Sequence, residues 1–362
     1  MLPEVMMRRS RWLGTAQRGR CRAAAVSIVA VPAVLAGLSL SGCGTRAAPA
    51  VGGGTAAADP ALVAITGSSA GGSSSRIELI SPRTGRVAKV VTGVSTGNGM
   101  ALSPDAKNVY VVGTAGRAIE IRRISVATGK GSVVAHGACP AVSPDGRHLA
   151  YATGARFTKV AVRDLRTGST RVIDVGSLLG SGGNFLNQGQ LTWLGDGHEV
   201  IAVPGITASE AAAESTGRAG AATVGGGKLP PGRQSLIVIK VGSGGLTARR
   251  IVVPDPYQDP FLVVSGDLSQ QRAVLLARMG YAAAGTVTQV KLRGNGYKAR
   301  VVGRLPRGMM PIAIAPHGHH VLFLTGHTPP QLWVASIGNG GLTGKHRLLT
   351  GTSRFGVDQA AW

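Results

Sequence analysis

Aromatic, acidic and cysteine residues are all scarce in this chain of 362 residues. Phe, Trp and Tyr make up 4% of it, whereas 55 residues are glycine. This balance disfavours long helices and favours many short strands joined by tight turns. Hydrophobic residues still form 44% of the chain, which is the composition of a globular protein. The length is compatible with one large domain or two ordinary ones.

Sequence motifs that mark common catalytic sites are also missing. The sequence shows no Ser nucleophile elbow between a strand and a helix, no cluster of metal ligands and no glycine loop of the phosphate-cradling kind. These absences make an enzyme less favoured without excluding one, because an active site can be assembled from residues far apart in sequence. The sequence alone therefore identifies no catalytic residue, and we expect neither a metal nor a cofactor.

The first 42 residues read as a secretory signal peptide. Six arginines between Arg8 and Arg22 precede an apolar run from Ala23 to Leu40, and small residues end that run. This is the order of the three regions of a signal. A permanent transmembrane helix is the alternative, but Pro32 and Gly37 interrupt a run of only about 18 residues, which is near the minimum for spanning.

The segment Leu40-Ser41-Gly42-Cys43 follows the apolar run directly. It resembles the lipobox of bacterial lipoproteins, in which a Leu and two small residues precede the cysteine that is acylated. The resemblance implies cleavage before Cys43, a palmitate-type lipid on that residue and attachment to the extracytoplasmic face of the cell membrane. Several acyl chains would give durable anchoring, where one chain would be marginal.

The cysteine count then leaves little for other roles. Cys21 would leave with the signal and Cys43 would carry the lipid, so Cys139 would be alone in the mature chain. Without an intrachain disulfide, stability has to come from packing. Because no neighbouring residue marks Cys139 as reactive, we predict a small buried apolar residue and not a nucleophile.

Basic residues strongly outnumber acidic ones. The chain has 39 Lys and Arg against 16 Asp and Glu, a formal charge of +23, and the signal contributes +5 of this through six arginines and Glu4. The remainder still carries about +18, which favours anionic neighbours such as phospholipid headgroups or wall polymers. Nucleic acid is less favoured as a partner, because no basic helix or stripe of aromatic and basic residues is present.

Residues 43–60 are rich in Gly, Ala, Thr and Pro and predict a flexible tether. From residue 61 to 362 a short apolar strand, a tight turn and a second apolar strand keep returning. Ser103-Pro104-Asp105 and Ser143-Pro144-Asp145-Gly146 form two of the turns, and related turns occur near Asp196, Asp267 and His317. Each hairpin is followed by two more strands, and four strands in about 40 to 50 residues are typical of a propeller blade.

The Ser-Pro-Asp-Gly hairpins resemble the TolB-like and WD40-like propeller repeats of bacterial envelope proteins. Five units are complete. The strands from residue 62 to 91 lack a first strand, whereas Val357 to Trp362 looks like a first strand without a blade. Joined, the two fragments predict an all-β, six-bladed propeller of four-stranded antiparallel blades, closed by the C-terminal strand. Residues 205–233 form an insertion, either a lid or partner-binding loop or a tolerated surface loop.

Two groups of polar residues invite a catalytic or metal-binding interpretation. Turn formation fully accounts for Asp105, Asp145, Asp196 and Asp267, since Asp bonds its own backbone in such turns. His317, His319, His320, His327 and His346 gather near the C-terminus, but no acidic or Cys ligand lies at metal spacing. We predict neither catalysis from the former nor a zinc site from the latter.

Loops that precede the innermost strands would surround the central funnel of a propeller. Amides with a few acids occupy these positions: Asn98, Gln188, Gln190, Asp259, Asp358 and Gln359, with Asn187 and Gln258 beside them. Such side chains suit hydrogen bonding to a sugar or peptide. The same side chains are equally suited to hydrogen bonding with the backbone N–H and C=O groups of their own loops.

These observations favour a membrane-anchored, extracytoplasmic binding or scaffold module of the cell envelope. Its partner would be an envelope protein or an anionic wall polymer. The alternative is a propeller enzyme, of the lyase or quinone-dependent dehydrogenase type, that acts on a small polar substrate in the funnel.

Overall fold

We describe the fold from a computed structural model. The structure describes residues 63–69, 75–81, 84–92, 99–115, 118–179, 185, 190–195, 197–204, 233–254, 262–266, 272–278, 285–294, 296–305, 309–315, 320–324, 331–338, 341–348 and 355–361. All of these residues belong to one compact unit, residues 54–362. Within the described ranges, no helix has the length and hydropathy needed to cross a membrane. Cys43 and the predicted signal and tether lie outside the described residues.

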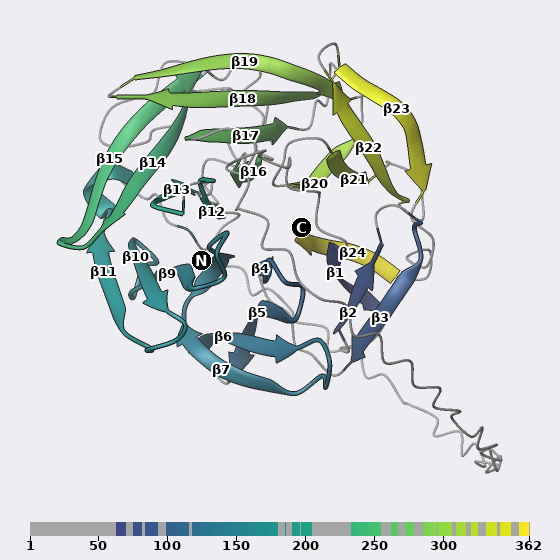
Figure 1. The fold of residues 1–362 in the computed structure, drawn as a ribbon, viewed down its shortest axis with the longest axis horizontal. Helices are drawn as coiled ribbons and strands as arrows, with labels where there is room; N and C mark the ends of the chain where they lie inside the picture. Colours follow the sequence, from purple (N-terminus) through teal and green to yellow (C-terminus); the bar gives the residue numbers. More distant parts are fainter. Residues whose placement is uncertain are drawn as a thin grey trace, which may run out of the picture. The chain divides into compact units, whose positions relative to one another are not determined.

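The described strands form six four-stranded antiparallel sheets, which we number in chain order. In each sheet the strands are given from the innermost to the outermost, as Figure 1 shows. Sheet 1 contains β24 (Phe355–Ala361), β1 (Val63–Ser69), β2 (Ser75–Ile80) and β3 (Val87–Thr92). Sheet 2 contains β4 (Met100–Leu102), β5 (Asn108–Ala115), β6 (Ala118–Ser125) and β7 (Gly131–His136). Sheet 3 contains β8 (Ala138–Val142), β9 (His148–Thr153), β10 (Lys159–Asp164) and β11 (Thr170–Asp174).

The other three sheets repeat this order. Sheet 4 contains β12 (Gln190–Trp193), β13 (Glu199–Val203), β14 (Arg233–Gly242) and β15 (Gly245–Pro254). Sheet 5 contains β16 (Leu262–Gly266), β17 (Ala273–Arg278), β18 (Gly285–Arg293) and β19 (Gly296–Leu305). Sheet 6 contains β20 (Met310–Ile314), β21 (His320–Leu324), β22 (Leu332–Gly338) and β23 (Gly341–Leu348). One short helix, α1 (Gly176–Leu179), follows β11.

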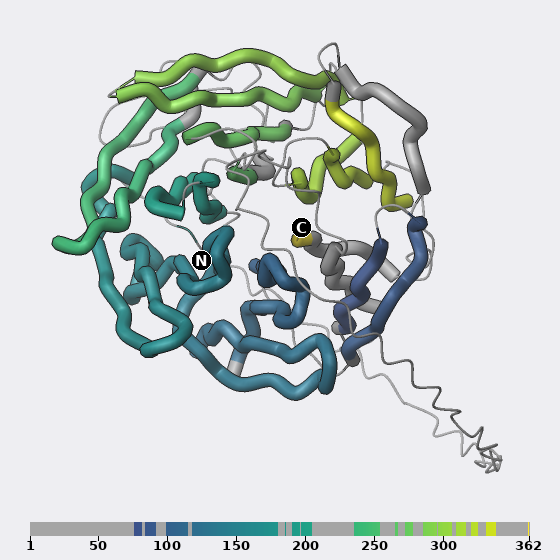
Figure 2. The backbone as a smooth tube through the Cα atoms, viewed as in Figure 1, coloured from purple at the N-terminus to yellow at the C-terminus, as the bar shows by residue number. Residues whose placement is uncertain are grey.

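The predicted all-β propeller of four-stranded antiparallel sheets is confirmed. Figure 2 shows the backbone passing from sheet 2 through sheet 5 around a common centre in sequence order. The C-terminal strand β24 pairs with β1 of the same sheet, for example Ala361 with Ala64. The predicted insertion follows β13 in the chain, and its last residue, Arg233, pairs with Pro254 as the first residue of β14. Residues 205–232 lie outside the described residues.

In sheets 2 to 6 the second strands are buried on both faces, because neighbouring sheets pack against one another. In β13, Val200 packs in the cluster that includes sheets 2 and 3, whereas its neighbour Ile201 packs with Val274 of sheet 5, and both are fully buried. Full burial of one such side chain contributes about 1.5–3 kcal/mol. Burial on both faces explains why the sequences of these second strands are continuous apolar runs and do not alternate between apolar and polar residues.

The Ser-Pro-Asp turns hold the hairpins through one recurring network. In sheet 2, Ser103 Oγ donates to Asp105 Oδ1 at 2.7 Å and accepts from the backbone N–H of Asn108 at 2.9 Å. The same Oδ1 accepts from the backbone N–H of Lys107 at 3.1 Å. The hydrogen bond from Ser103 is the main reason why the pKa of Asp105 lies below its usual value. The turn interpretation of Asp105 is therefore confirmed.

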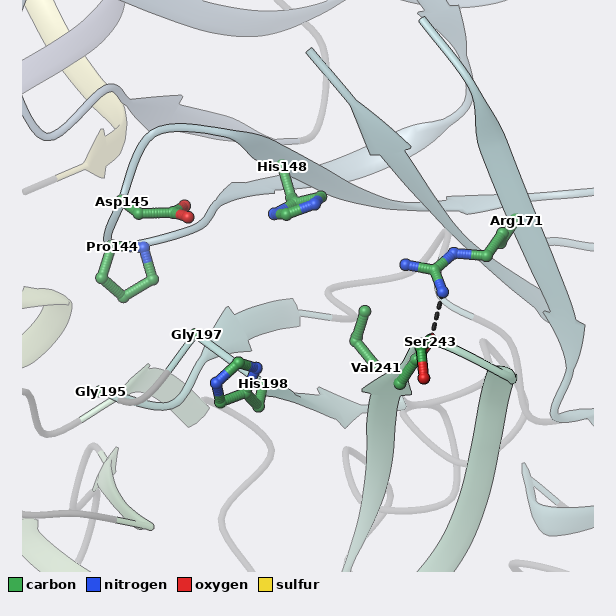
Figure 3. A pocket seen from close by; sticks show the side chains of 10 residues that line it. Pro144, Asp145, His148, Arg171, Gly195, Gly197, His198, Val241 and Ser243 are labelled. Atoms are coloured by element: carbon green, nitrogen blue, oxygen red, sulfur yellow. Dashed lines mark hydrogen bonds between the residues drawn. The ribbon is translucent and has the colours of Figure 1, made fainter. Parts of the chain in front are cut away.

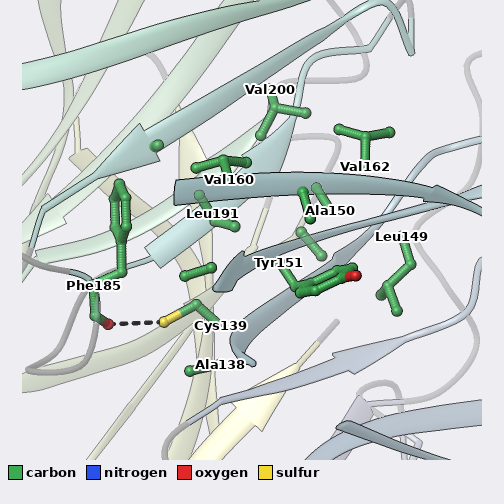
Figure 4. Close-up of a cluster of buried hydrophobic side chains, with 14 of the residues drawn as sticks. Ala138, Cys139, Leu149, Ala150, Tyr151, Val160, Val162, Phe185, Leu191 and Val200 are labelled. Carbon is green, nitrogen blue, oxygen red and sulfur yellow. Dashed lines mark hydrogen bonds between the residues drawn. The ribbon is translucent and has the colours of Figure 1, made fainter. Parts of the chain in front are cut away.

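Cys139 lies in the buried core at a register shift of β8, where its backbone φ is +53°. Its Sγ donates to the carbonyl oxygen of Phe185 at 3.1 Å, as Figure 4 shows. Burial raises the pKa of this thiol to about 12. The prediction of a buried cysteine is therefore confirmed, and because the thiolate is the reactive form, we expect the thiol to be inert in the folded protein.

Candidate functional site

The antiparallel order of every sheet separates two faces of the propeller. The turn from the first to the second strand and the turn from the third to the fourth strand lie on one face, which we call the turn face. The loops that lead into the innermost strands lie on the opposite face. The predicted rim residues were chosen from those loops, so they belong to the face opposite the turn face.

The described residues assemble little of the predicted rim. Asn98, Gln188 and Asp259 lie outside them. Gln190 is the first residue of β12, pairs with Val203 and is half-buried. Asp358 and Gln359 lie inside β24, which begins at Phe355, two residues before the expected start at Val357. A register shift next to Thr66, the partner of Gln359, accommodates this longer strand.

A cleft of about 300 Å³ opens on the turn face between sheets 3 and 4. Its walls come from the turn after β8, the start of β9, the outer strand β11, the turn after β12 and the turn between β14 and β15. In Figure 3 the side chains of His148 and His198 lie on opposite walls, with Arg171 at one end and Asp145 at the other. No motif in the sequence connects these four side chains.

His148 is held in place by its own turn and by an aromatic neighbour. Its backbone N–H donates to Ser143 Oγ at 2.8 Å. Its ring lies 6.0 Å from the ring of Trp193, centroid to centroid, at an interplanar angle of 35°. Trp193 is buried and donates from Nε1 to the carbonyl oxygen of Ala141 at 3.0 Å, which ties sheet 4 to sheet 3. The imidazole therefore stands on a rigid support.

Asp145, the one acidic residue among the described residues that line the cleft, is engaged within its own turn. Its Oδ1 accepts from Ser143 Oγ and from the backbone N–H of Arg147, the latter at 3.0 Å. Partial burial tends to raise the pKa of Asp145, but these hydrogen bonds and the nearby His148 and Arg147 outweigh it and hold the pKa below its usual value. The turn interpretation of Asp145 is confirmed, while Asp196 and Asp267 lie outside the described residues.

Arg171 crosses from sheet 3 to sheet 4. Its guanidinium donates to the carbonyl oxygen of Gly242, the last residue of β14. On the other wall, the carbonyl oxygen of His198 accepts from the backbone N–H of Val241 at 2.8 Å. The two sheets are thus linked at the end of the cleft, and the lining turns have little freedom to move apart.

In sheets 2 to 5, the residue directly before the second strand is a Lys, an Arg or a His. Lys107, Arg147, His198 and Arg272 occupy this position, and the carbonyl oxygen of each accepts from the end of the third strand of its sheet at 2.8 Å. Arg272 also donates from Nε and Nη2 to the two carboxylate oxygens of Glu199 in sheet 4, each at 2.9 Å. The spacing was visible in the sequence and would have indicated a cationic turn face.

Positive charge also increases from the centre to the outside of the propeller. The six outermost strands carry nine Lys or Arg and one acidic residue, Asp174, whereas the innermost strands, as described, carry no Lys or Arg. The nine are Lys89, Arg171, Arg249, Arg250, Lys298, Arg300, Arg304, Lys345 and Arg347. Arg171, Lys298, Arg300 and Arg304 are exposed.

Metal ligation finds no support in the part of the chain that the structure describes. No group of three or more His, Cys, Asp or Glu lies close enough there to hold an ion. Of the C-terminal histidines, His320 is the first residue of β21 and His346 lies in β23, whereas His317, His319 and His327 lie outside the described residues.

Comparisons with known proteins agree on the fold. No protein-family model and no curated protein sequence matches the chain. The structure of TolB from Acinetobacter baumannii is similar with a TM-score of 0.55 and 14% identity, over 83% of this chain and 66% of that one. A chain of the nidogen/laminin complex is similar with a TM-score of 0.51 and 11% identity, over 83% of this chain and 97% of that one. The chain thus spans about two thirds of the TolB chain, and at these identities the likeness shows a propeller fold alone.

Proposed function

We propose that this chain is a lipid-anchored, extracytoplasmic propeller that binds an anionic polymer of the cell envelope without catalysis. The distribution of charge over its strands carries the proposal. Nine basic residues against one acidic residue on the outermost strands give the circumference a field of one sign. Such a field attracts polyanions and raises the rate of encounter with them.

The outer strand β19 is the strongest part of this surface. Lys298, Arg300 and Arg304 are exposed along it, and Val301 between them is 55% exposed. At about 3.4 Å per residue, Lys298 and Arg300 stand roughly 7 Å apart along the strand. A row of cations at this spacing suits a polymer whose repeating units carry phosphate or another acidic group.

The anchor and the closed ring are parts of the same proposal. The lipobox-like segment before Cys43 would place the chain on the outer face of the membrane, and residues 43–60 would tether the propeller to it. A six-bladed ring is supported by the pairing of β24 with β1 and by the packing of Ile80 of sheet 1 with Leu322 of sheet 6. A ring leaves no long sheet edge open except the outer strands, which are the proposed binding surface.

A binding experiment with paired variants tests the proposal. The full-length protein is titrated with poly(glycerol phosphate) and with an uncharged dextran of similar length at low and moderate salt. Lys298→Gln/Arg304→Gln removes two exposed outer charges and keeps Arg300, whose Nε bonds Gln289 Oε1 at 2.9 Å. Lys107→Gln/Lys130→Gln removes two exposed charges from turns of sheet 2 and is the matched control.

At about 1 kcal/mol for each basic residue near a polyanionic surface, the β19 double variant should bind roughly 30-fold more weakly at low salt. The control should lose much less, and the effect should fade as salt rises. Equal binding of dextran and poly(glycerol phosphate), or equal losses in the two double variants, would contradict the proposal.

A further inference from the structure

We infer that the cleft between sheets 3 and 4 is a binding site for a phosphate group. The inference goes beyond polymer binding by the outer strands, because of the basic residues on those strands only Arg171 lines the cleft. At roughly 30 Å³ for each water molecule, a volume of about 300 Å³ holds about ten waters. That is room for a phosphate group with a small polyol attached.

The cleft offers donors on three sides. His148 and His198 face each other across it, and Arg171 stands at one end, as Figure 3 shows. A guanidinium has five N–H donors, and the bond from Arg171 to Gly242 uses one of them. The four oxygens of a phosphate point in different directions and accept hydrogen bonds from such donors. Charge-assisted hydrogen bonds of this kind are about twice as strong as hydrogen bonds between neutral groups.

Asp145 is the one carboxylate among the described residues that line the cleft. Asp145 accepts two hydrogen bonds inside its turn through Oδ1, and the Nε of Arg147 lies 3.9 Å from its Oδ2. These contacts, together with the solvent that reaches the half-exposed carboxylate, weaken the repulsion that Asp145 exerts on an anion. The electrostatic character of the remaining lining is set by the guanidinium and the two imidazoles.

The donors are held before any ligand arrives. His148 rests on the start of β9 and against Trp193, and Arg171 is fixed by the turn of the neighbouring sheet. Gly197 takes a φ of +69°, and a Cβ built on it would meet no atom within 4 Å, so this wall of the cleft stays open. Pre-organised groups lose little conformational entropy on binding.

The hairpin itself does not require histidine at position 148. In sheet 2 the same turn is built with Asn108 at the corresponding place, and its backbone N–H makes the equivalent bond to Ser103 Oγ at 2.9 Å. The imidazole is therefore an addition to a turn that already folds without it. His148→Asn copies the sheet 2 turn and should leave the fold intact.

The test is a titration of the full-length protein with inorganic phosphate, followed by calorimetry and by tryptophan fluorescence, since Trp193 lies beside His148. Sodium chloride at equal ionic strength is the control for screening. Wild-type protein should show saturable phosphate binding, weakened tenfold or more by His148→Asn and by Arg171→Gln. Lys107→Gln, which removes a charge from the matching turn of sheet 2, should bind like the wild type.

Binding of the protein to vesicles that contain an anionic phospholipid is compared with its binding to neutral vesicles. This comparison distinguishes a lipid headgroup from free phosphate as the source of the bound group. Binding of phosphate that His148→Asn leaves unchanged, or a response that chloride reproduces, would overturn the inference. If the cleft variants no longer bind phosphate but still bind poly(glycerol phosphate), the cleft and the outer surface are supported as two separate binding sites. If no polymer binds while the cleft still takes phosphate, only the proposed function fails.

Discussion

The ion pair between Glu199 and Arg272 joins sheets 4 and 5 and allows a sharp prediction about stability. The two side chains form two hydrogen bonds of 2.9 Å, and their burial is unequal. The side chain of Glu199 is 10% exposed and that of Arg272 is 36% exposed. Removal of one partner therefore leaves either a buried carboxylate or a guanidinium that water can reach.

The unequal burial predicts unequal costs. Arg272→Met keeps the apolar stem but leaves Glu199 buried without its partner, and should cost about 3 kcal/mol of unfolding free energy. Glu199→Gln leaves Arg272 hydrated and should cost about 1 kcal/mol. The double variant removes both charges, so it should be more stable than Arg272→Met alone, with a coupling energy of about 2 kcal/mol.

Urea unfolding of the full-length protein, followed by far-ultraviolet circular dichroism, measures all four proteins under one condition. Similar slopes would show that midpoint differences report stability and not altered compactness. Arg272→Lys is a useful fifth protein, because it keeps the charge and loses the two-pronged geometry. The reasoning would be refuted if Arg272→Met cost no more than Glu199→Gln, or if adding Glu199→Gln to it brought a further loss.

Three other predictions follow from single residues. Glu78 is buried in β2, its Oε2 has no partner among the described residues, and burial raises its pKa despite Arg76 at 2.9 Å. A raised pKa in the folded state lowers stability as pH rises through it, so Glu78→Gln should stabilise the protein at pH 7 in thermal unfolding, with the gain vanishing below the unfolded pKa of about 4.3. Cys139 should react with a maleimide only after unfolding, since its pKa is about 12; rapid labelling of the native protein would contradict this. Cys43→Ala should abolish labelling by an alkyne-tagged palmitate and move the chain from the membrane fraction to the soluble one, whereas Cys139→Ala should leave both unchanged.

The fold was readable from the sequence because local turn chemistry repeats. Ser, Pro, Asp and Gly at fixed places specify a tight turn wherever they occur, and the structure shows the same serine network at Ser103 and Ser143. Even the departure at Gly195 to Gly197 keeps a hairpin, with the N–H of Leu194 donating to the carbonyl oxygen of Glu199 at 2.9 Å. Such turns depend on a few neighbouring residues, which is why a single sequence suffices to predict them.

The cleft could not be predicted in the same way. It joins His148 in one hairpin, His198 in the next and Arg171 in an outer strand, and their meeting depends on how sheets 3 and 4 pack. Sequence reasoning placed the site on the opposite face, because loops before inner strands usually surround the funnel of a propeller. The Lys, Arg or His directly before the second strand in sheets 2 to 5 was the one signal for the turn face, and it shows only when the hairpins are aligned.

Binding to native cell walls tests the central claim most directly. Full-length protein is sedimented with walls from the producing cells, before and after chemical removal of their phosphate-bearing polymers. We predict retention on untreated walls, loss after removal, and weaker retention of Lys298→Gln/Arg304→Gln than of Lys107→Gln/Lys130→Gln. Equal retention on treated and untreated walls would contradict the claim, and so would turnover of a wall component by the protein.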